Sequence, residues 1–360
     1  MNRNVLGKGM RAARRDVLVI AVAVFSLGMM PAKPLAQSAP PQEMRKGLQI
    51  LLLGTHGGPA LDEQRSEPAT LLIVDGKPYL IDCGIGTMRR LLQAGVPSET
   101  IGSVFITHLH PDHALGLVDV LANDYHYLDM DAPQSHREFD IYGPPQTPAL
   151  VSAAYDTIRI PYGIFAAEPI GRSPLFDPFR AHAIDHDGEV YRDDRIRVTA
   201  AENTHYQLMP AKDRASMKSY SYRFETRYGA VVFTGDTGPS AAVEALAKNA
   251  DVLISEVEDL NAMENDARAI GDAGNADTLV KHMQAEHLPM HAVGELASRA
   301  EVRSVILNHF LGGENGARFV AGVKEAYAGP VYAGRDLDRY CLAADVAGGG
   351  TEASRLRPCR

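Results

Sequence analysis

Apolar stretches alternate with polar turns along the chain from Leu48 onward, a pattern typical of strands and helices packed in layers. Residues 70–74 and 78–81 predict a hairpin that turns at Asp75-Gly76-Lys77, and helical spacing predicts helices at 86–94, 241–248 and 292–300. The uninterrupted apolar runs predict further strands at 48–54, 101–107, 196–200, 219–225, 230–234, 252–256 and 304–308. Strands precede helices in both halves, so the order favours two sheets covered outside by helices.

The middle of the chain, residues 119–195, has no sustained period apart from a strand and turn at 141–145 and a helix at 149–158. We interpret the rest of it as an insertion that faces the substrate. Its aromatic side chains could form an apolar wall, although packing in the core is their commoner role: Tyr155, Tyr162, Phe165, Phe176 and Phe179. Its histidines are interpreted as scattered polar residues: His126, His136, His182 and His186.

The N-terminus has the composition of an export signal, which we place at residues 1–36. Basic residues (Arg11, Arg14 and Arg15) precede an apolar stretch at 17–30, and small residues follow near Ala36. The Arg14-Arg15 pair resembles a twin-arginine signal, and a spacer follows at 37–47. We therefore expect a periplasmic or secreted protein without stable membrane insertion; an uncleaved anchor is the alternative.

Composition indicates one ordinary globular domain, placed at 48–345, with a tail at 346–360. Of the 360 residues 45% are hydrophobic and 22% charged, and the net charge of -9 argues against a polyanionic partner. We therefore expect no nucleic acid as partner. Three cysteines are too few for a disulfide scaffold: Cys83 is interpreted as a small buried residue, and Cys341 and Cys359 could pair.

Four ligand-type side chains follow the predicted strand at 101–107. His108 and His110 are two residues apart, and in extended backbone they point to the same side, so they can converge on one ion. Pro111 suits the first turn of a helix, which would direct Asp112 and His113 toward a second ion. Two adjacent hydrolytic metal ions are the natural interpretation of this cluster.

Three more candidate ligands, His205, Asp236 and His309, each come shortly after an apolar strand. Each also has a structural interpretation: a loop histidine, a turn or capping carboxylate, and a partly buried imidazole. Taken with the first cluster, they complete a metal site at strand ends, where rigid sheets position reacting groups.

These residues resemble the motifs of the metallo-β-lactamase-fold hydrolases, in the branch that holds ribonuclease Z, arylsulfatase-type and cyclic-nucleotide phosphodiesterase-type enzymes. The histidine run is highly specific, whereas the glycine turns are weak alone. The matching motifs are LGTHGGP (53–59), IDCG (81–84), HLHPDH (108–113), YGPP (142–145), TGDT (234–237) and NH (308–309). The resemblance implies an α/β fold, a four-layer αββα sandwich with metals at one edge of the paired sheets.

The resemblance also implies roles for single residues. One ion would be held by His108, His110 and His205 and the other by Asp112, His113 and His309, with Asp236 bridging. Two divalent ions, zinc by default with manganese or iron as alternatives, would bring the pKa of a shared water toward about 7.

Two catalytic residues are expected, Asp112 beside the metals and His287 as general acid or stabiliser of the leaving oxygen. Leu288 departs from the small hydroxyl residue usual after that histidine. His56 replaces a small residue of the first glycine loop; it could line the pocket and is not counted as a ligand.

The function expected from these residues is an exported dinuclear metal hydrolase that cleaves a phosphate or sulfate ester of a small molecule with a metal-bridging hydroxide. A lactone or other acyl-bond hydrolase is the first alternative. Export and negative charge weigh against ribonuclease Z-type RNA processing, and the complete ligand set weighs against a non-catalytic metal-binding module. A homodimer that uses the segment at 329–342 is possible by analogy with relatives.

Overall fold

The computed structural model describes residues 46–130, 138–168, 177–269, 273–311, 316–343 and 355–359. The chain divides into two units, Met1–Ala39 and Pro40–Arg360, and all described residues lie in the second. The predicted export signal at 1–36 lies outside the described residues, as do His136 and Phe176. No helix of the described ranges is both long and apolar enough to cross a membrane.

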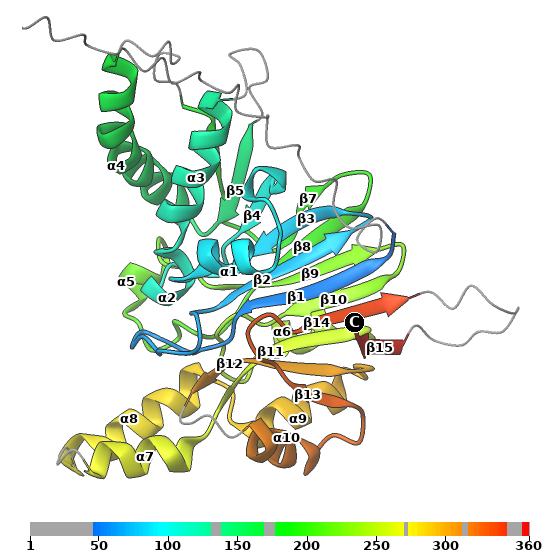
Figure 1. The fold of residues 1–360 in the computed structure, drawn as a ribbon. Coiled ribbons are helices and arrows are strands. Elements are labelled where there is room, and N and C mark those ends of the chain that lie inside the picture. The colour runs from blue at the N-terminus through cyan, green and yellow to red at the C-terminus, as the bar shows by residue number, and fades with distance from the viewer. Residues whose placement is uncertain are drawn as a thin grey trace, which may run out of the picture. The chain divides into compact units, whose positions relative to one another are not determined.

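Two sheets form the centre of the second unit (Figure 1). The first has the order β15 (Arg355–Pro358), β14 (Arg339–Ala343), β1 (Leu48–Gly54), β2 (Ala69–Val74), β3 (Lys77–Ile81), β4 (Ser103–Phe105), β5 (Phe139–Gly143) and β6 (Phe179–Ala183). The second has the order β13 (Val331–Ala333), β12 (Val305–Leu311), β11 (Val252–Glu258), β10 (Gly229–Phe233), β9 (Tyr220–Thr226), β8 (Ile196–Glu202) and β7 (Gly188–Arg192).

Most of the strands that carry the candidate ligands have parallel neighbours in their sheet. In the first sheet β3, β4, β5 and β6 are parallel neighbours, and in the second β10, β11, β12 and β13 are. Because the carboxyl ends of parallel strands meet at one edge of a sheet, the loops that follow β4 and β10 and the last residues of β12 gather at such edges. β8 runs antiparallel to β9, which in turn is antiparallel to β10, so β8 ends at the same edge as β10.

Three apolar clusters separate the four layers. One lies between the facing sheets and includes Leu52, Phe105 and Tyr222. A second lies between the first sheet and the helices α1 (Thr87–Gln93), α3 (Leu117–Met130) and α4 (Thr147–Ala167). The third lies under α6 (Ala241–Ala247), α9 (Met290–Arg299) and α10 (Gly316–Lys324). The predicted αββα sandwich is therefore confirmed (Figure 1).

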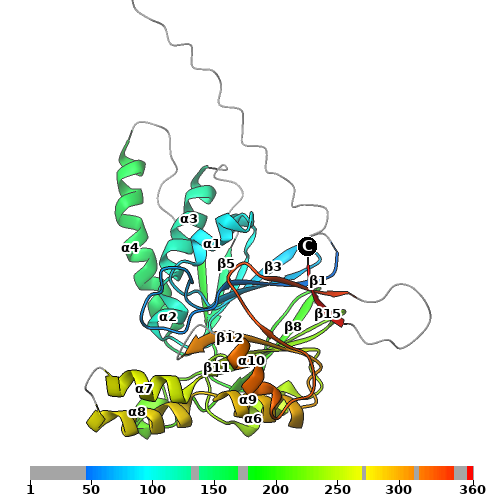
Figure 2. The same cartoon turned by 60° about the horizontal axis from the view of Figure 1, so that its bottom comes forward.

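The remaining helices lie in loops. They are η2 (Ser98–Thr100), α2 (Pro111–Ala114), α5 (Ala211–Arg214), α7 (Leu260–Ala269) and α8 (Ala273–Glu286). Figure 2 shows α7 and α8 side by side as a hairpin that lies beyond the end of β11. The sequence did not predict this hairpin, because α7 and α8 have few large apolar residues; Asp259, directly before α7, was a usable capping signal, and its Oδ1 accepts a hydrogen bond from the Ala262 N–H at 3.1 Å.

The middle segment differs from the predicted irregular insertion, because it supplies regular elements of the first sheet and its helical layer. Helix α4 extends to Ala167, past Pro161, and so is much longer than the predicted helix. Tyr155, Tyr162 and Phe179 pack in or against the apolar cluster under α3 and α4, so core packing is their role. The interpretation of these three side chains as an apolar wall for the substrate is therefore wrong.

The C-terminal strand is fastened to the first sheet in two ways. β15 pairs with β14 in antiparallel register, and Cys341 and Cys359 form a disulfide. Leu356 of β15 is buried in the cluster between the sheets. Cys83 is free and buried, as expected of a small core residue. The last strand therefore belongs to the folded domain.

Candidate metal centre and active site

The histidine run leaves β4 at the edge of the first sheet. The backbone of His110 is extended, and Pro111 begins α2 directly after it. His108 and His110 therefore lie on the extended segment, and Asp112 and His113 lie on the first turn of the helix, as the spacing predicted. All but His110 are buried.

All seven predicted ligands come together. One group consists of His108, His110, His205 and Asp236, whose candidate ligand atoms lie within 4.8 Å of one another. A second group, within the same limit, consists of Asp112, His113 and His309. The histidine run follows β4 of the first sheet. In the second sheet His205 lies in the loop after β8, Asp236 in the loop after β10 and His309 in β12 itself, so both sheets contribute to the site.

Asp236 lies between the two groups. Its Oδ2 is 3.2 Å from His309 Nε2 and 3.8 Å from His108 Nε2, and its Oδ1 is 3.3 Å from His113 Nε2. A carboxylate with one ligand group on each side can contact two ions at once. This placement agrees with the bridging role that the resemblance implies.

The side chains fit divalent metal ions. Nε2 of His108, Nε2 of His113 and Oδ1 of Asp236 are buried without a hydrogen-bond partner among the described residues. His205 Nε2 and His110 Nδ1 lie 3.0 Å apart. Two imidazole nitrogens that each bind one tetrahedral ion at about 2.0–2.1 Å lie roughly 3.3 Å apart. Buried lone pairs at this separation suit a shared cation.

The electrostatics of the site also favour cations. Burial lowers the pKa of His108 well below its usual value and that of His205 to about 3, so both imidazoles are neutral and keep a lone pair for a metal. Burial alone would lower the pKa of His113, but the carboxylates of Asp236, Asp82 and Asp112 raise it well above its usual value. The surrounding carboxylates thus stabilise positive charge at the place where His113 and His309 meet.

Asp82 orients the His113 ring through Nδ1, the nitrogen that does not face the metal group. Its carboxylate accepts hydrogen bonds from His113 Nδ1 at 2.9 Å and from the Thr107 backbone N–H at 2.7 Å. Donation from Nδ1 leaves the Nε2 lone pair of His113 free to face the metal group. Asp82 was not among the residues predicted for the site, although its place directly after an apolar strand, in the IDCG motif, was a usable signal.

The first glycine loop forms a wall of the site. The Gly58 N–H donates to Asp112 Oδ2 at 2.9 Å, and a Cβ at Gly58 would lie only 2.3 Å from the Asp112 Cβ. A Cβ at Gly57 would lie 2.9 Å from the His309 ring. The backbone can approach these two ligands only without side chains. His56 instead bonds the Ala60 carbonyl through Nε2 at 2.9 Å and is no part of the ligand groups.

His287 lies beside the cluster, as predicted. Its ring centroid is 4.9 Å from that of His205, and its Nδ1 donates to Glu256 Oε2 at 2.6 Å. Burial would lower the pKa of His287, but Glu256 raises it to about 10, so the imidazole is held protonated. Glu256 was not predicted, because a glutamate in an apolar strand gives no sign of its partner 31 residues later.

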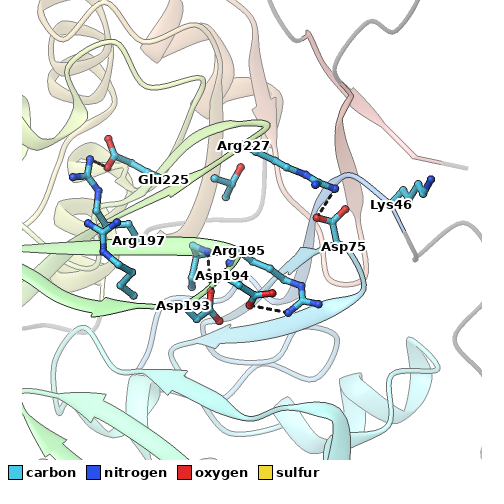
Figure 3. A pocket seen from close by; sticks show the side chains of 11 residues that line it. Lys46, Asp75, Asp193, Asp194, Arg195, Arg197, Glu225 and Arg227 are labelled. Carbon is cyan, nitrogen blue, oxygen red and sulfur yellow. Dashed lines mark hydrogen bonds and ion pairs between the residues drawn. The ribbon is translucent and has the colours of Figure 1, made fainter.

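A separate polar cavity of about 650 Å³ lies at the opposite end of the strands of the second sheet (Figure 3). It is lined by the start of β8 and the end of β9, whereas His205 follows the end of β8. Arg227 pairs with Asp75 at 2.9 Å and Arg195 with Asp194 at 3.0 Å. The paired charges and the lack of histidines in the lining exclude it as the metal centre.

Comparison with known proteins identifies the family of the chain. A family model described as the beta-lactamase superfamily domain matches residues 78–310, a range that contains all seven candidate ligands and His287. The chain belongs to this family, the metallo-β-lactamase-fold hydrolases, and within it resembles the ribonuclease Z branch.

The chain is similar to curated ribonucleases and to solved structures of the same fold. The chain is 29% identical over 302 residues to ribonuclease Z of Mycolicibacterium paratuberculosis, with 81% of this chain and 97% of that protein covered. It is 28% identical over 301 residues to ribonuclease Z of Mycobacterium marinum, covering 81% and 98%. Two solved structures share the fold. One is the metallo-β-lactamase fold protein YhfI from Bacillus subtilis, with a TM-score of 0.59 and 16% identity, where the match covers 82% of this chain and 98% of that chain. The other is the short form of human tRNase Z, with a TM-score of 0.53 and 19% identity, where it covers 81% of this chain and 98% of that chain.

These relatives correct two predictions. The expected arylsulfatase- or phosphodiesterase-type activity on a small-molecule ester is wrong, because the curated relatives matched over nearly their whole length are ribonucleases. The expectation that nucleic acid is not a partner is wrong for the same reason. The physical error was to use the net charge of -9 of the whole chain, since binding depends on the local field, which bound cations can reverse.

Proposed function

We propose that this protein is a metal-dependent ribonuclease that hydrolyses a phosphodiester bond of RNA, with transfer RNA as the first substrate to test. The observation that carries the proposal is the convergence of seven ligand-type side chains beside His287, in a chain that aligns with 97% of a ribonuclease Z. Metal-dependent hydrolysis belongs to the family; the RNA substrate and the residue roles are part of this proposal.

The two ligand groups would each hold one divalent ion, with Asp236 between them. Bound divalent ions supply a nucleophile at neutral pH and polarise the phosphoryl oxygen under attack. Zinc suits the imidazole-rich first group, and manganese or iron are alternatives for the site as a whole. Asp82 and Gly58 hold His113 and Asp112 in place through the hydrogen bonds described above.

We assign His287 as the proton donor to the leaving oxygen. Glu256 accepts the hydrogen bond from Nδ1, which fixes the ring and stabilises its protonated form. The other ring nitrogen is then the one that can give its proton to the oxygen as the bond to phosphorus breaks. A positioned acid of this kind contributes typically about 10²–10⁴-fold to the rate.

We also retain export as a separate proposal; an exported enzyme would meet RNA outside the cytoplasm, so export and cleavage of transfer RNA are tested independently. The Cys341–Cys359 disulfide supports it, since disulfides persist in oxidising compartments. Detection of the protein in periplasmic and secreted fractions, with a cytoplasmic enzyme as control, tests this point. Residence of all the protein in the cytoplasm would contradict it.

The test of function compares substrates on purified, metal-loaded protein. We expect cleavage of unprocessed transfer RNA, loss of that cleavage in Asp112→Ala, and normal cleavage in Asp156→Asn, a control on α4 whose side chain is 60% exposed. Aryl sulfate, bis-aryl phosphate and lactone substrates are assayed in parallel. Turnover of a sulfate or lactone without any RNA cleavage would refute the proposal.

A further inference from the structure

The last residue of α8, Glu286, holds the loop that carries His205 at two points. Its backbone carbonyl accepts a hydrogen bond from His205 Nδ1 at 3.0 Å. Its side-chain Oε1 accepts another from the Leu208 backbone N–H at 2.9 Å. The two contacts are three residues apart in the loop, so they fix both the imidazole ring and the backbone that follows it.

The surroundings of Glu286 also hold it against the loop that carries His205. The residue is only 6% exposed, and its second carboxylate oxygen lies 3.2 Å from Nε2 of His282, one turn earlier in α8. The Gln207 side-chain amide donates to the carbonyl of the neighbouring Ala285. A Cβ at Gly238 would lie 1.7 Å from that same carbonyl, so the loop after Asp236 also packs against this junction.

The ring contact decides which nitrogen of His205 can bind a metal. A proton on Nδ1, donated to the carbonyl, leaves the lone pair on Nε2. That nitrogen is 3.0 Å from His110 Nδ1 and belongs to the first ligand group. Partners that orient a ligating imidazole in this way are typically worth about 10–100-fold in metal affinity.

We propose that Glu286 is a positioning residue for the first metal group: its carbonyl orients His205, and its carboxylate holds the loop at Leu208. The inference rests on the proposed function, because it requires that this group binds a metal. It adds that the second helix of the α7–α8 hairpin is built into the metal centre. Glu286 itself is not among the grouped ligands.

Zinc titration of the metal-free protein tests the proposal without any substrate. We expect Glu286→Ala to weaken zinc affinity about 10-fold, the lower end of the range for such partners, because the Leu208 N–H loses its acceptor while the backbone carbonyl that orients the His205 ring remains. Glu286→Gln keeps an acceptor oxygen and should stay within about threefold of wild type. Glu295→Ala, a control on α9 whose side chain is 46% exposed, should bind zinc like wild type.

A second readout separates positioning from general structural damage. In Glu286→Ala the activity lost at low zinc should return as zinc is raised, and the circular dichroism spectrum and urea midpoint of the metal-free variant should match those of the metal-free wild type, which a misfolded variant would not show. If Glu286→Ala does not fold, Glu286→Asp, which withdraws the acceptor by one methylene, should show a smaller loss in the same direction. Wild-type zinc affinity in every folded Glu286 variant would overturn this inference alone; absence of zinc binding by the wild-type protein would overturn the proposed function.

Discussion

Replacement of Glu258 by leucine should make the metal-free protein more stable at alkaline pH. Glu258 ends β11 and is completely buried, and neither carboxylate oxygen has a hydrogen-bond partner among the described residues. Burial raises the pKa of this carboxyl from its usual 4.5 to about 8, because His287 opposes the shift only in part and Glu256 adds to it. The carboxyl therefore carries its proton at neutral pH.

The sign and size of the effect follow from proton linkage. The folded protein holds this proton more tightly than the unfolded chain does. The contribution of the protonated carboxyl to the free energy of unfolding is therefore fully present below about pH 4.5 and is lost as the pH rises to about 8. One pKa unit corresponds to about 1.4 kcal/mol, so the loss is on the order of 5 kcal/mol. Leucine cannot ionise and fills the buried position with an apolar side chain.

Urea unfolding at several values between pH 5 and pH 9, in the presence of a chelator, measures this difference. The free energy of unfolding of wild type minus that of Glu258→Leu should fall as the pH rises from 5 to about 8 and level off above it, since titrating groups away from Glu258 cancel in the difference. Glu258→Gln removes the titration but keeps a buried polar group, so its difference from the leucine variant should not change with pH, and it should be less stable than the leucine variant. Glu301→Gln, a control at a side chain 66% exposed, should follow wild type. Parallel curves for wild type and Glu258→Leu would refute the reasoning.

Four further results are expected. Asp112→Asn should lose activity by about 100-fold or more and bind less metal, with an unchanged circular dichroism spectrum; full activity would disprove its role. Gly58→Ala should act in the same direction, because its Cβ would overlap Asp112, and metal content compared with wild type checks this. His287→Ala should lower kcat about 10²–10⁴-fold with little change in KM, measured at saturating substrate; a KM effect alone would contradict proton donation. Cys359→Ser should lose about 3 kcal/mol of unfolding free energy, judged from the 18-residue separation, and should match wild type under reducing conditions.

The sequence was sufficient to locate the metal ligands because each lies at the end of an apolar run or shortly after it. The strand at 48–54 was predicted with the same bounds as β1, and the apolar run before His108 forms β4. Burial of such runs is a local property, so the pattern identifies the strands without knowledge of their partners. Once the strand ends are known, ligand-type residues after them are natural candidates for one site.

The contacts that support the ligands could not be predicted in the same way. Asp82 and His113 are 31 positions apart, and Glu286 and His205 are 81 apart, so their hydrogen bonds depend on how two loops meet. Nothing in the local pattern around Glu286 distinguishes it from an ordinary helical glutamate. The α7–α8 hairpin was missed for a related reason, since its weak apolar pattern does not specify a helix before it packs.

The geometry of the metal centre depends on the core between the sheets. His108 comes from the loop after β4 in the first sheet, and Asp236 follows β10 in the second. Their separation of 3.8 Å exists only while the two sheets stay packed through residues such as Phe105 and Phe233. A cation bound between these side chains would in turn hold the sheets together, so metal affinity and folding stability must be linked. Substitutions in the distant core should therefore weaken metal binding even though they touch no ligand.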